Sequence, residues 1–223
     1  SYALDAPAGG SFAEIAGGAL VSAIDGTQYI VGGTRLAGGP SARVLVIDSA
    51  GKVSFAALSA PREGACATFV EGRGLVIVGG DATASGAEVL AKGATLGTPL
   101  PFPADSVRGC AATALDNAHV AIAGGGSGGP VRVLDLACTT ACGPASWPDS
   151  LPLVRAEAFA LAPDAAIVLG DDASGASHAY RASAAGLREL PLRIPRRGAR
   201  LVATPTNAYA VVGGGPGIEQ YRE

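Results

Sequence analysis

The tetrapeptide Ile30-Val31-Gly32-Gly33 returns four times along the chain with small changes. Its later copies are Ile77-Val78-Gly79-Gly80, Ile122-Ala123-Gly124-Gly125, Val168-Leu169-Gly170-Asp171 and Val211-Val212-Gly213-Gly214. The first glycines stand at 32, 79, 124, 170 and 213, so the spacings are 47, 45, 46 and 43 residues. Repeats of this length are typical of propellers and solenoids, and five of them account for the 223 residues.

Each repeat contains four short apolar segments separated by turn residues. In the first repeat we expect strands over 19–24, 28–31, 43–47 and 53–58, with turns at Asp25-Gly26 and over 48–51. Short strands joined by Asp-Gly and Gly-rich turns indicate consecutive antiparallel pairing. Four-stranded units repeated radially are the blades of a β-propeller, whereas open solenoids use mostly helical or parallel-strand units. The sequence therefore predicts an all-β fold, a β-propeller of five four-stranded antiparallel blades, in which each Gly pair serves a positive φ or a close backbone approach.

The ends of the chain predict how the ring closes. We expect one domain over 1–223, with repeat units 16–60, 61–106, 107–153, 154–196 and 197–223, the last completed by 1–15. The segment 2–15 aligns without a gap to 45–58, which places Phe12 on Phe55. Pairing of the N- and C-terminal strands would remove exposed sheet edges. Both 2–5 and 218–222 fit the third strand of the shared blade, and the alternative is a fragment of a larger propeller.

Composition excludes several classes of protein. The 33 Gly and 15 Pro residues oppose a helical bundle, and 48% apolar with 16% charged residues opposes disorder. The net charge is −3 and the arginines are scattered, so we expect no nucleic-acid partner. No apolar run reaches the 18 or so residues of a membrane span, so we expect none.

The four cysteines indicate in which kind of cellular compartment the protein resides. Cys138 and Cys142 bracket three residues in a loop-like stretch, and no second Cys pair or nearby His completes a metal site. We expect a disulfide between Cys138 and Cys142, and the alternative is that both are free thiols. We expect Cys66 and Cys110 to be free thiols that pack in the core. The chain has no Met, so we expect a processed or excised piece. A disulfide implies an oxidising compartment, so we expect an extracellular, periplasmic or cell-envelope location.

The five units resemble the kelch-repeat propellers, in a bacterial variant poor in aromatic residues. A kelch unit carries an apolar strand ending in Gly-Gly and a Leu-Pro-x-x-Arg type connection into the next unit. Similar connections lie at 147–155, with Leu151, Pro152 and Arg155, and at 55–62 and 190–196. The chain departs from the family in its 5% aromatic content and in having five units where six or seven are usual. The resemblance implies that partners bind the propeller face formed by the loops.

The loops between units and those after each Gly-Gly are expected to converge on one rim. The candidate ligand-binding residues there are Arg35, Arg62, Arg108, Arg155, Arg196, Arg197, Asp81, Asp171 and Asp172. Guanidinium groups bind carboxylates in bidentate fashion. We therefore expect a noncatalytic binding or scaffolding module for a protein or an acidic small ligand, without a cofactor or metal. The other reading is that each Arg ties neighbouring blades together.

Enzymatic alternatives have less support in the sequence. No nucleophile elbow, phosphate loop or metal cluster is present, and His119 and His178 are expected outside the rim. The alternative is a propeller-type glycan-active hydrolase or lyase that uses Asp171, Asp172 or Glu157 on acidic sugars, with rim arginines holding the substrate. A third possibility is an excised propeller without a function of its own.

Overall fold

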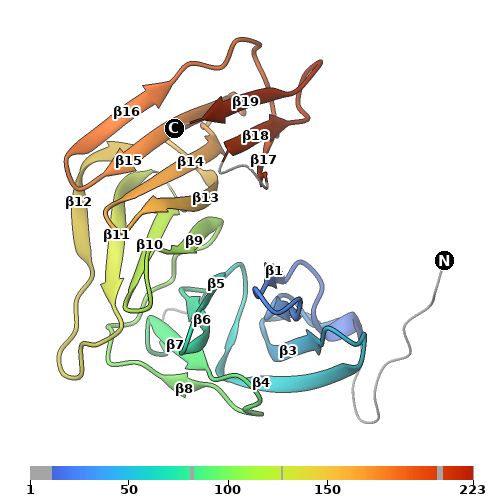
Figure 1. The fold of residues 1–223 in the computed structure, drawn as a ribbon. Coiled ribbons are helices and arrows are strands. Elements are labelled where there is room, and N and C mark those ends of the chain that lie inside the picture. Colours follow the sequence, from blue (N-terminus) through green and yellow to red (C-terminus); the bar gives the residue numbers. More distant parts are fainter. Residues whose placement is uncertain (1–11, 81–82, 127, 205–207, 223) are drawn as a thin grey trace. The chain divides into compact units, whose positions relative to one another are not determined.

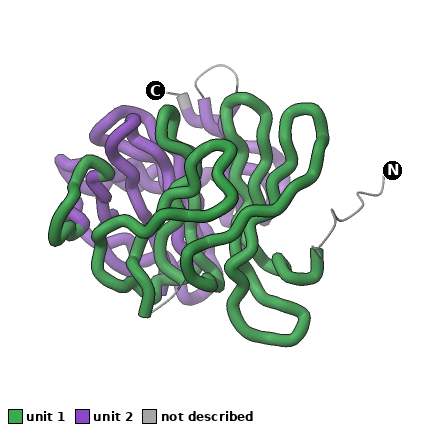
Figure 2. Tube along the Cα trace, turned by 90° about the horizontal axis from the view of Figure 1, so that it is seen from below, with its two compact units in different colours: residues 1–108, 136–143 green, residues 109–135, 144–223 purple. Residues whose placement is uncertain are grey.

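The computed structural model describes residues 12–80, 83–126, 128–204 and 208–222. The chain divides into two compact units, shown in green and purple in Figure 2. Unit 1 comprises residues 1–108 and 136–143, and unit 2 comprises 109–135 and 144–223. Apart from one short 3-10 helix, η1 (Phe12–Glu14), the regular elements in the described ranges are all strands.

Unit 1 holds two four-stranded antiparallel sheets, each built from strands that follow one another in the chain (Figure 1). The strands of the first sheet are β1 (Ala19–Ser22), β2 (Gln28–Val31), β3 (Ser41–Ile47) and β4 (Val53–Arg62). Those of the second are β5 (Cys66–Val70), β6 (Gly74–Val78), β7 (Ala87–Leu90) and β8 (Thr98–Pro99). Apolar side chains of both sheets form one core, which includes Val31, Val44, Leu75 and Ile77.

Unit 2 holds two four-stranded sheets and one three-stranded sheet, again in consecutive order. The first sheet contains β9 (Cys110–Ala114), β10 (His119–Gly124), β11 (Gly129–Asp135) and β12 (Ala145–Leu151). The second contains β13 (Arg155–Ala162), β14 (Ala165–Asp171), β15 (Ser177–Ser183) and β16 (Gly186–Leu190). The third contains β17 (Arg200–Ala203), β18 (Ala208–Val212) and β19 (Glu219–Arg222).

Two apolar cores hold the sheets of unit 2 together. Leu151, Leu153, Ala166 and Val168 belong to the core shared by the first and second sheets. The opposite face of the second sheet contributes Ile167 and Leu169 to a separate core with Leu201 and Val211 of the third sheet. Because side chains alternate along a strand, β14 supplies both cores and is buried over nearly its whole length.

In both sheets of unit 1, the first glycine of the Gly-Gly pair lies against the connection that leads out of the sheet. Gly32 has φ +61°, and a Cβ added there would lie 2.6 Å from the carbonyl oxygen of Arg62. Gly79 has φ +73°, and its added Cβ would lie 2.5 Å from the carbonyl oxygen of Val107. Both expected reasons for glycine, positive φ and close backbone approach, therefore hold at these two positions.

The sequence-based prediction of an all-β fold with four-stranded antiparallel sheets is confirmed. The expected strands 19–24, 28–31, 43–47 and 53–58 match β1 to β4 within a few residues. The third sheet of unit 2 differs, because its described part has three strands, and β19 occupies the position for which 2–5 and 218–222 competed. The part of the chain that the structure describes contains no helix with the length and hydrophobicity of a membrane span.

The expected N-terminal strand lies mostly outside the described residues, since these begin at Phe12. Its described end is not a strand: Phe12–Glu14 form η1, and Phe12 contacts the ring of Phe55 with 6.3 Å between ring centroids. The alignment of Phe12 with Phe55 therefore did not predict equivalent backbone conformations. The carboxylate of Glu14 pairs instead with Arg43 of β3.

Candidate functional site

The predicted rim residues fall into both units. Unit 1 contains Arg35, Arg62 and Arg108, and Asp81 lies outside the described residues. The members in unit 2 are Arg155, Arg196, Arg197, Asp171 and Asp172. Since these residues differ strongly in burial, they do not form one class.

Arg62 ends β4 and is fully buried, with every guanidinium nitrogen engaged. Its Nε donates to Oε1 of Glu88 over 2.5 Å, and its Nη1 and Nη2 donate to the carbonyl oxygens of Gly79 (2.6 Å) and Ser85 (2.7 Å). Glu88 is also fully buried, and its Oε2 accepts the backbone N–H of Ser59 over 2.6 Å. The first sheet of unit 1 is thereby tied to the second through a paired buried charge.

Arg196 makes the same arrangement in unit 2. Its Nε donates to Oε1 of Glu219 over 3.1 Å, and its Nη1 donates to the carbonyl oxygen of Gly213 over 2.6 Å. In both arrangements the arginine precedes the accepting Gly-Gly glycine by 17 residues. Burial by itself raises the pKa of Glu219. The hydrogen bonds from Arg193, Arg196 and Ile194 together lower the pKa by more than burial raises it, so the pKa lies below its usual value.

The expectation that Arg62 and Arg196 line an accessible rim is therefore wrong. Both are almost completely buried, because a glutamate on the third strand of the following sheet and a Gly-Gly carbonyl together satisfy the guanidinium. An isolated buried charge is strongly unfavourable, and the paired acid offsets that cost. These two arginines fit the other reading of the sequence, in which arginines hold neighbouring sheets together.

The exposed arginines of unit 1 lie where three loops meet. Arg108 donates from Nη1 to Oε2 of Glu63 over 2.7 Å, while Oε1 of Glu63 accepts the hydroxyl of Thr34 over 3.0 Å. The side chain of Arg108 is 56% exposed. Arg35 follows Thr34 and lines an open cavity of about 460 Å³. The loops after β2, β4 and β8 therefore come together in this unit.

Unit 2 brings loops together around Asp171, the last residue of β14. Arg155 donates to Oδ2 of Asp171 from Nε (3.1 Å) and Nη2 (2.8 Å). Oδ1 accepts the hydroxyl of Ser177 (2.7 Å) and the N–H of Gly198 (3.1 Å). Burial by itself raises the pKa of Asp171. The hydrogen bonds from Ser177, Gly198 and Arg155 together lower the pKa by more than burial raises it, so the pKa of Asp171 lies below its usual value.

Asp172 holds the loop that follows. Its Oδ1 accepts hydrogen bonds from the hydroxyl and N–H of Ser174 and from the N–H of Ala176. Hydrogen bonds from Ser174, Ala176 and His178 hold the pKa of Asp172 at about 2, with the Ser174 hydroxyl the largest cause. His178 lies 3.2 Å from Oδ2 of Asp172 and 3.3 Å from Oε1 of Glu189.

The expectation that His178 lies away from the rim residues is therefore wrong. This histidine is the second residue of β15, directly opposite Gly170 of β14, so the tight hairpin between the two strands returns it to Asp172. A signal was available in the sequence, because the short stretch 173–175 contains Ser and Gly, which favour a tight turn.

Glu157 and His119 both make side-chain contacts with other residues of unit 2. Glu157 of β13 pairs with Arg200 of β17, and its Oε2 accepts the N–H of Leu201 over 2.7 Å, so this carboxylate joins the second and third sheets. His119 contacts Asp116 in the turn between β9 and β10. Within the described ranges, no group of three or more His, Cys, Asp or Glu side chains is arranged to hold a metal ion.

Arg197 lies in the connection between β16 and β17 and is exposed. Its Nη1 donates to the carbonyl oxygen of Ser174 over 2.9 Å, which ties this connection to the Asp172 loop. Its backbone N–H donates to the carbonyl oxygen of Gly214 over 3.1 Å. The structure thus gathers Arg155, Asp171, Asp172 and Arg197 through shared loop contacts, whereas Arg196 is directed into the protein.

The cysteines are all oxidised. Cys138 and Cys142 form a disulfide with 5.9 Å between their Cα atoms. Cys66 and Cys110 are disulfide-bonded as well, so the expectation that they pack as thiols is wrong. Whether a cysteine is oxidised depends on the approach of another sulfur. Short spacing predicts such an approach for Cys138 and Cys142, but the sequence offers no comparable signal for Cys66 and Cys110.

Comparisons with known proteins bear on the fold alone. No protein-family model matches the chain, so the kelch resemblance stays a prediction. No curated protein matches it either. A solved structure, Kuenenia stuttgartiensis hydrazine synthase, is similar with a TM-score of 0.58 at 17% sequence identity. The match covers 86% of this chain and 54% of that one, a β-rich protein with β-propeller domains.

Proposed function

We propose that the chain is a noncatalytic binding or scaffolding module of the kelch-like β-propeller class, which recognises a protein or acidic ligand through its exposed arginines. In this proposal the repeat units 16–60, 61–106, 107–153, 154–196 and 197–223 are five blades. Residues 1–15 complete the last one. The consecutive antiparallel sheets and the fold likeness to a protein with propeller domains support this architecture.

The observation that carries the binding proposal is the division of the arginines into buried and exposed sets. Arg62 and Arg196 form buried ion pairs with Glu88 and Glu219. In contrast, the side chain of Arg108 is 56% exposed, and Arg35 and Arg197 are also exposed. An exposed ion pair such as Arg108 with Glu63 contributes only about 0–1 kcal/mol. A carboxylate of a partner can therefore replace Glu63 at little cost.

Titration calorimetry with a polyglutamate peptide tests this proposal. We expect binding that weakens as salt rises, because exposed charges are screened, and that weakens in R35Q, R108Q and R197Q. The matched control is K52Q, which removes an exposed cation outside these loops. Binding that is equal in all four variants would reject the assignment of these arginines.

The alternative function, a glycan-active enzyme for acidic sugars, has less support. Glycoside hydrolysis commonly needs one carboxylic acid that stays protonated near neutral pH. The pKa values of Asp171 and Asp172 are instead lowered, and Glu157 is held by Arg200 and Leu201. Turnover of uronate oligosaccharides that disappears in D171N, D172N or E157Q would favour the enzyme over the binding module.

We also propose an extracellular, periplasmic or cell-envelope location. The disulfide between Cys138 and Cys142 supports this location, because disulfides persist mainly in oxidising compartments. Cell fractionation of the source organism with an antibody against the chain tests it. Recovery in the cytosolic fraction would contradict the proposal.

A further inference from the structure

A cavity of unit 1 lies at a bulge between β3 and β4. In register Arg43 is paired with Ala57, and the next pair is Ser41 with Arg62, so several residues of β4 stand opposite Ala42 alone. Extra residues in one strand bend it and disrupt the ladder locally. Residues on both strands beside this bulge line the cavity, and its volume of about 460 Å³ lies within the range of small-molecule sites.

Three alanines and one aromatic ring form the apolar part of the wall. They are Ala42, Ala56, Ala57 and Phe55. The short alanine side chains leave the space open, and the ring of Phe55 also contacts that of Phe12, with 6.3 Å between the ring centroids. Such a wall favours a ligand with an apolar body, because covering the wall removes apolar area from water.

The charged part of the wall combines a neutralised acid with a cation that no described residue pairs. Glu14 forms an ion pair with Arg43, whose guanidinium also lies 5.0 Å from the centroid of the Phe55 ring. Arg35 is exposed, and its guanidinium has no ion pair or hydrogen bond within the part of the chain that the structure describes. An anion in the cavity would therefore gain the charge of Arg35, while the nearby carboxylate of Glu14 is already compensated.

A buried hydroxyl adds a second donor to this wall. Ser41 lines the cavity and is 2% exposed. Its Oγ accepts the N–H of Arg43 over 3.1 Å, and none of the described residues accepts its hydroxyl hydrogen. The hairpin between β2 and β3 brings Ser41 near Arg35, since the N–H of Ser41 donates to the carbonyl oxygen of Gly33 over 2.9 Å. A buried donor without an acceptor is unfavourable, so a ligand oxygen that accepts from Ser41 would be favoured.

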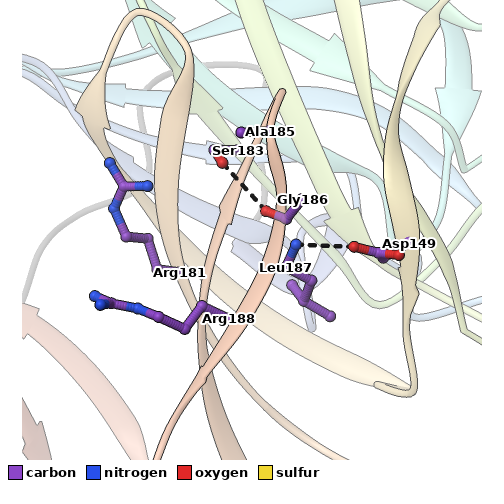
Figure 3. A pocket seen from close by; sticks show the side chains of 7 residues that line it. All are labelled: Asp149, Arg181, Ser183, Ala185, Gly186, Leu187 and Arg188. Atoms are coloured by element: carbon purple, nitrogen blue, oxygen red, sulfur yellow. Dashed lines mark hydrogen bonds between the residues drawn. The ribbon is translucent and has the colours of Figure 1, made fainter.

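An open cavity of about 370 Å³ beside β15 and β16 in unit 2 differs in this respect (Figure 3). There the hydroxyl of Ser183 donates to the carbonyl oxygen of Gly186 over 3.1 Å, and Oδ2 of Asp149 accepts the N–H of Leu187 over 3.0 Å. The serine and the acid of that wall thus bond to the protein itself, whereas the hydroxyl hydrogen of Ser41 is left for a ligand.

We propose that the unit 1 cavity binds a small monocarboxylic acid with an apolar body, in its ionised form. The carboxylate accepts from Arg35 and Ser41, since a guanidinium fork matches carboxylate geometry, and the body covers Phe55 and the alanines. A neutral molecule would gain nothing from the charge of Arg35, and an inorganic anion would leave the apolar wall uncovered. This site deepens the proposed function, on which it rests for the role of Arg35 in binding.

The test titrates benzoate into the full chain and follows the backbone amides of Ala42, Arg43 and Ala56 by NMR. We expect these amides to shift. Benzoate should bind at least about tenfold more tightly than acetate, because its ring buries apolar area. It should also bind at least about tenfold more tightly than benzamide, which has nearly the same shape without the charge. Equal affinities of the three probes, or tighter binding of inorganic sulfate than of benzoate, would overturn the proposal.

Variants assign the effect to the two donors. R35Q changes an exposed side chain, and we expect it to weaken benzoate binding about tenfold, whereas K52Q should leave the binding unchanged. S41A should also weaken it about tenfold, and S54A, which changes an exposed serine of β4, is its matched control. Unchanged affinity in R35Q or in S41A would overturn the site. The comparison of probes uses the unaltered chain, so it holds even where a variant fails to fold.

Polyglutamate separates this site from the wider proposed function. If the unaltered chain binds polyglutamate but not benzoate, the cavity site is overturned and recognition by the exposed arginines stands. If the chain binds benzoate with the expected preferences but does not bind polyglutamate, the cavity site is supported and recognition of an acidic partner by the exposed arginines as a set is contradicted.

Discussion

The Nε atom of Arg62 donates to Oε1 of Glu88 over 2.5 Å, and both side chains are fully buried. Removal of one partner leaves an uncompensated buried charge, which costs about 3–5 kcal/mol. We therefore expect R62A to lower the free energy of unfolding by about that amount in urea denaturation. R108A is the matched control, and it should lose less than about 1 kcal/mol because its ion pair is exposed. Equal losses in the two variants would contradict the structural role of Arg62.

Arg196 and Glu219 predict a second, independent loss in the other unit. We expect R196A to destabilise the chain by an amount similar to R62A, measured in the same denaturation experiment, because its guanidinium is also buried and paired. The control is R193A, whose side chain is exposed. A value for R196A that matches R193A would show that the pair is not a structural tie.

Gly79 and Gly93 give a matched test of the Gly-Gly motif. Both have positive φ, +73° and +78°, but an added Cβ at Gly79 would lie 2.5 Å from the carbonyl oxygen of Val107, whereas nothing lies within 4 Å of one at Gly93. G93A carries only the conformational cost of about 1–2 kcal/mol. G79A should lose a further ~1–3 kcal/mol, because the backbone must move. Thermal and urea unfolding of both variants measures the difference, and equal losses would contradict the close approach.

The pKa of Asp172 predicts a pH dependence at the acid end. Its folded value of about 2 lies below the unfolded value of 3.8, so its contribution to stability is present above about pH 4. That contribution is lost as the pH falls through about 2. We expect the stability of D172N to vary less with pH across this window than that of the unaltered chain. A carboxyl titration midpoint near the unfolded value for Asp172 by NMR would contradict the hydrogen bonds from Ser174 and Ala176.

The cysteines predict the outcome of a thiol titration. Under denaturing, nonreducing conditions we expect no free thiol, because all four cysteines are disulfide-bonded. After reduction, all four should react. Any thiol that reacts before reduction would contradict the oxidised state, and it would also remove the support for an oxidising compartment.

The strand order was predictable from sequence because turn chemistry and apolar segments are local. Gly32 and Gly79 mark a backbone geometry that only glycine adopts easily, and the same Gly-Gly step recurs along the chain. The burial and the partner of each arginine were not predictable in the same way. Arg62 and Arg108 have similar places in their repeats, yet only Arg62 meets a buried acid on the third strand of the following sheet, Glu88.

Arg181 of β15 lies directly opposite Arg188 of β16, and this pairing was not predictable from the sequence either. It depends on the register between β15 and β16, which the turn at 184–185 determines and composition does not reveal. His178 likewise reaches Asp172 only because the hairpin between β14 and β15 is tight. Side-chain partners that depend on register or on a distant strand required the structure.

The central proposal is that exposed arginines bind a partner while buried arginines hold the sheets together. Calorimetric titration of polyglutamate into the R108Q/R197Q double variant at low salt tests this division most directly. We expect the dissociation constant to rise at least about tenfold, in line with the loss of charged hydrogen bonds, while K52Q stays at the value of the unaltered chain. A double variant that binds polyglutamate as tightly as the unaltered chain would contradict the division.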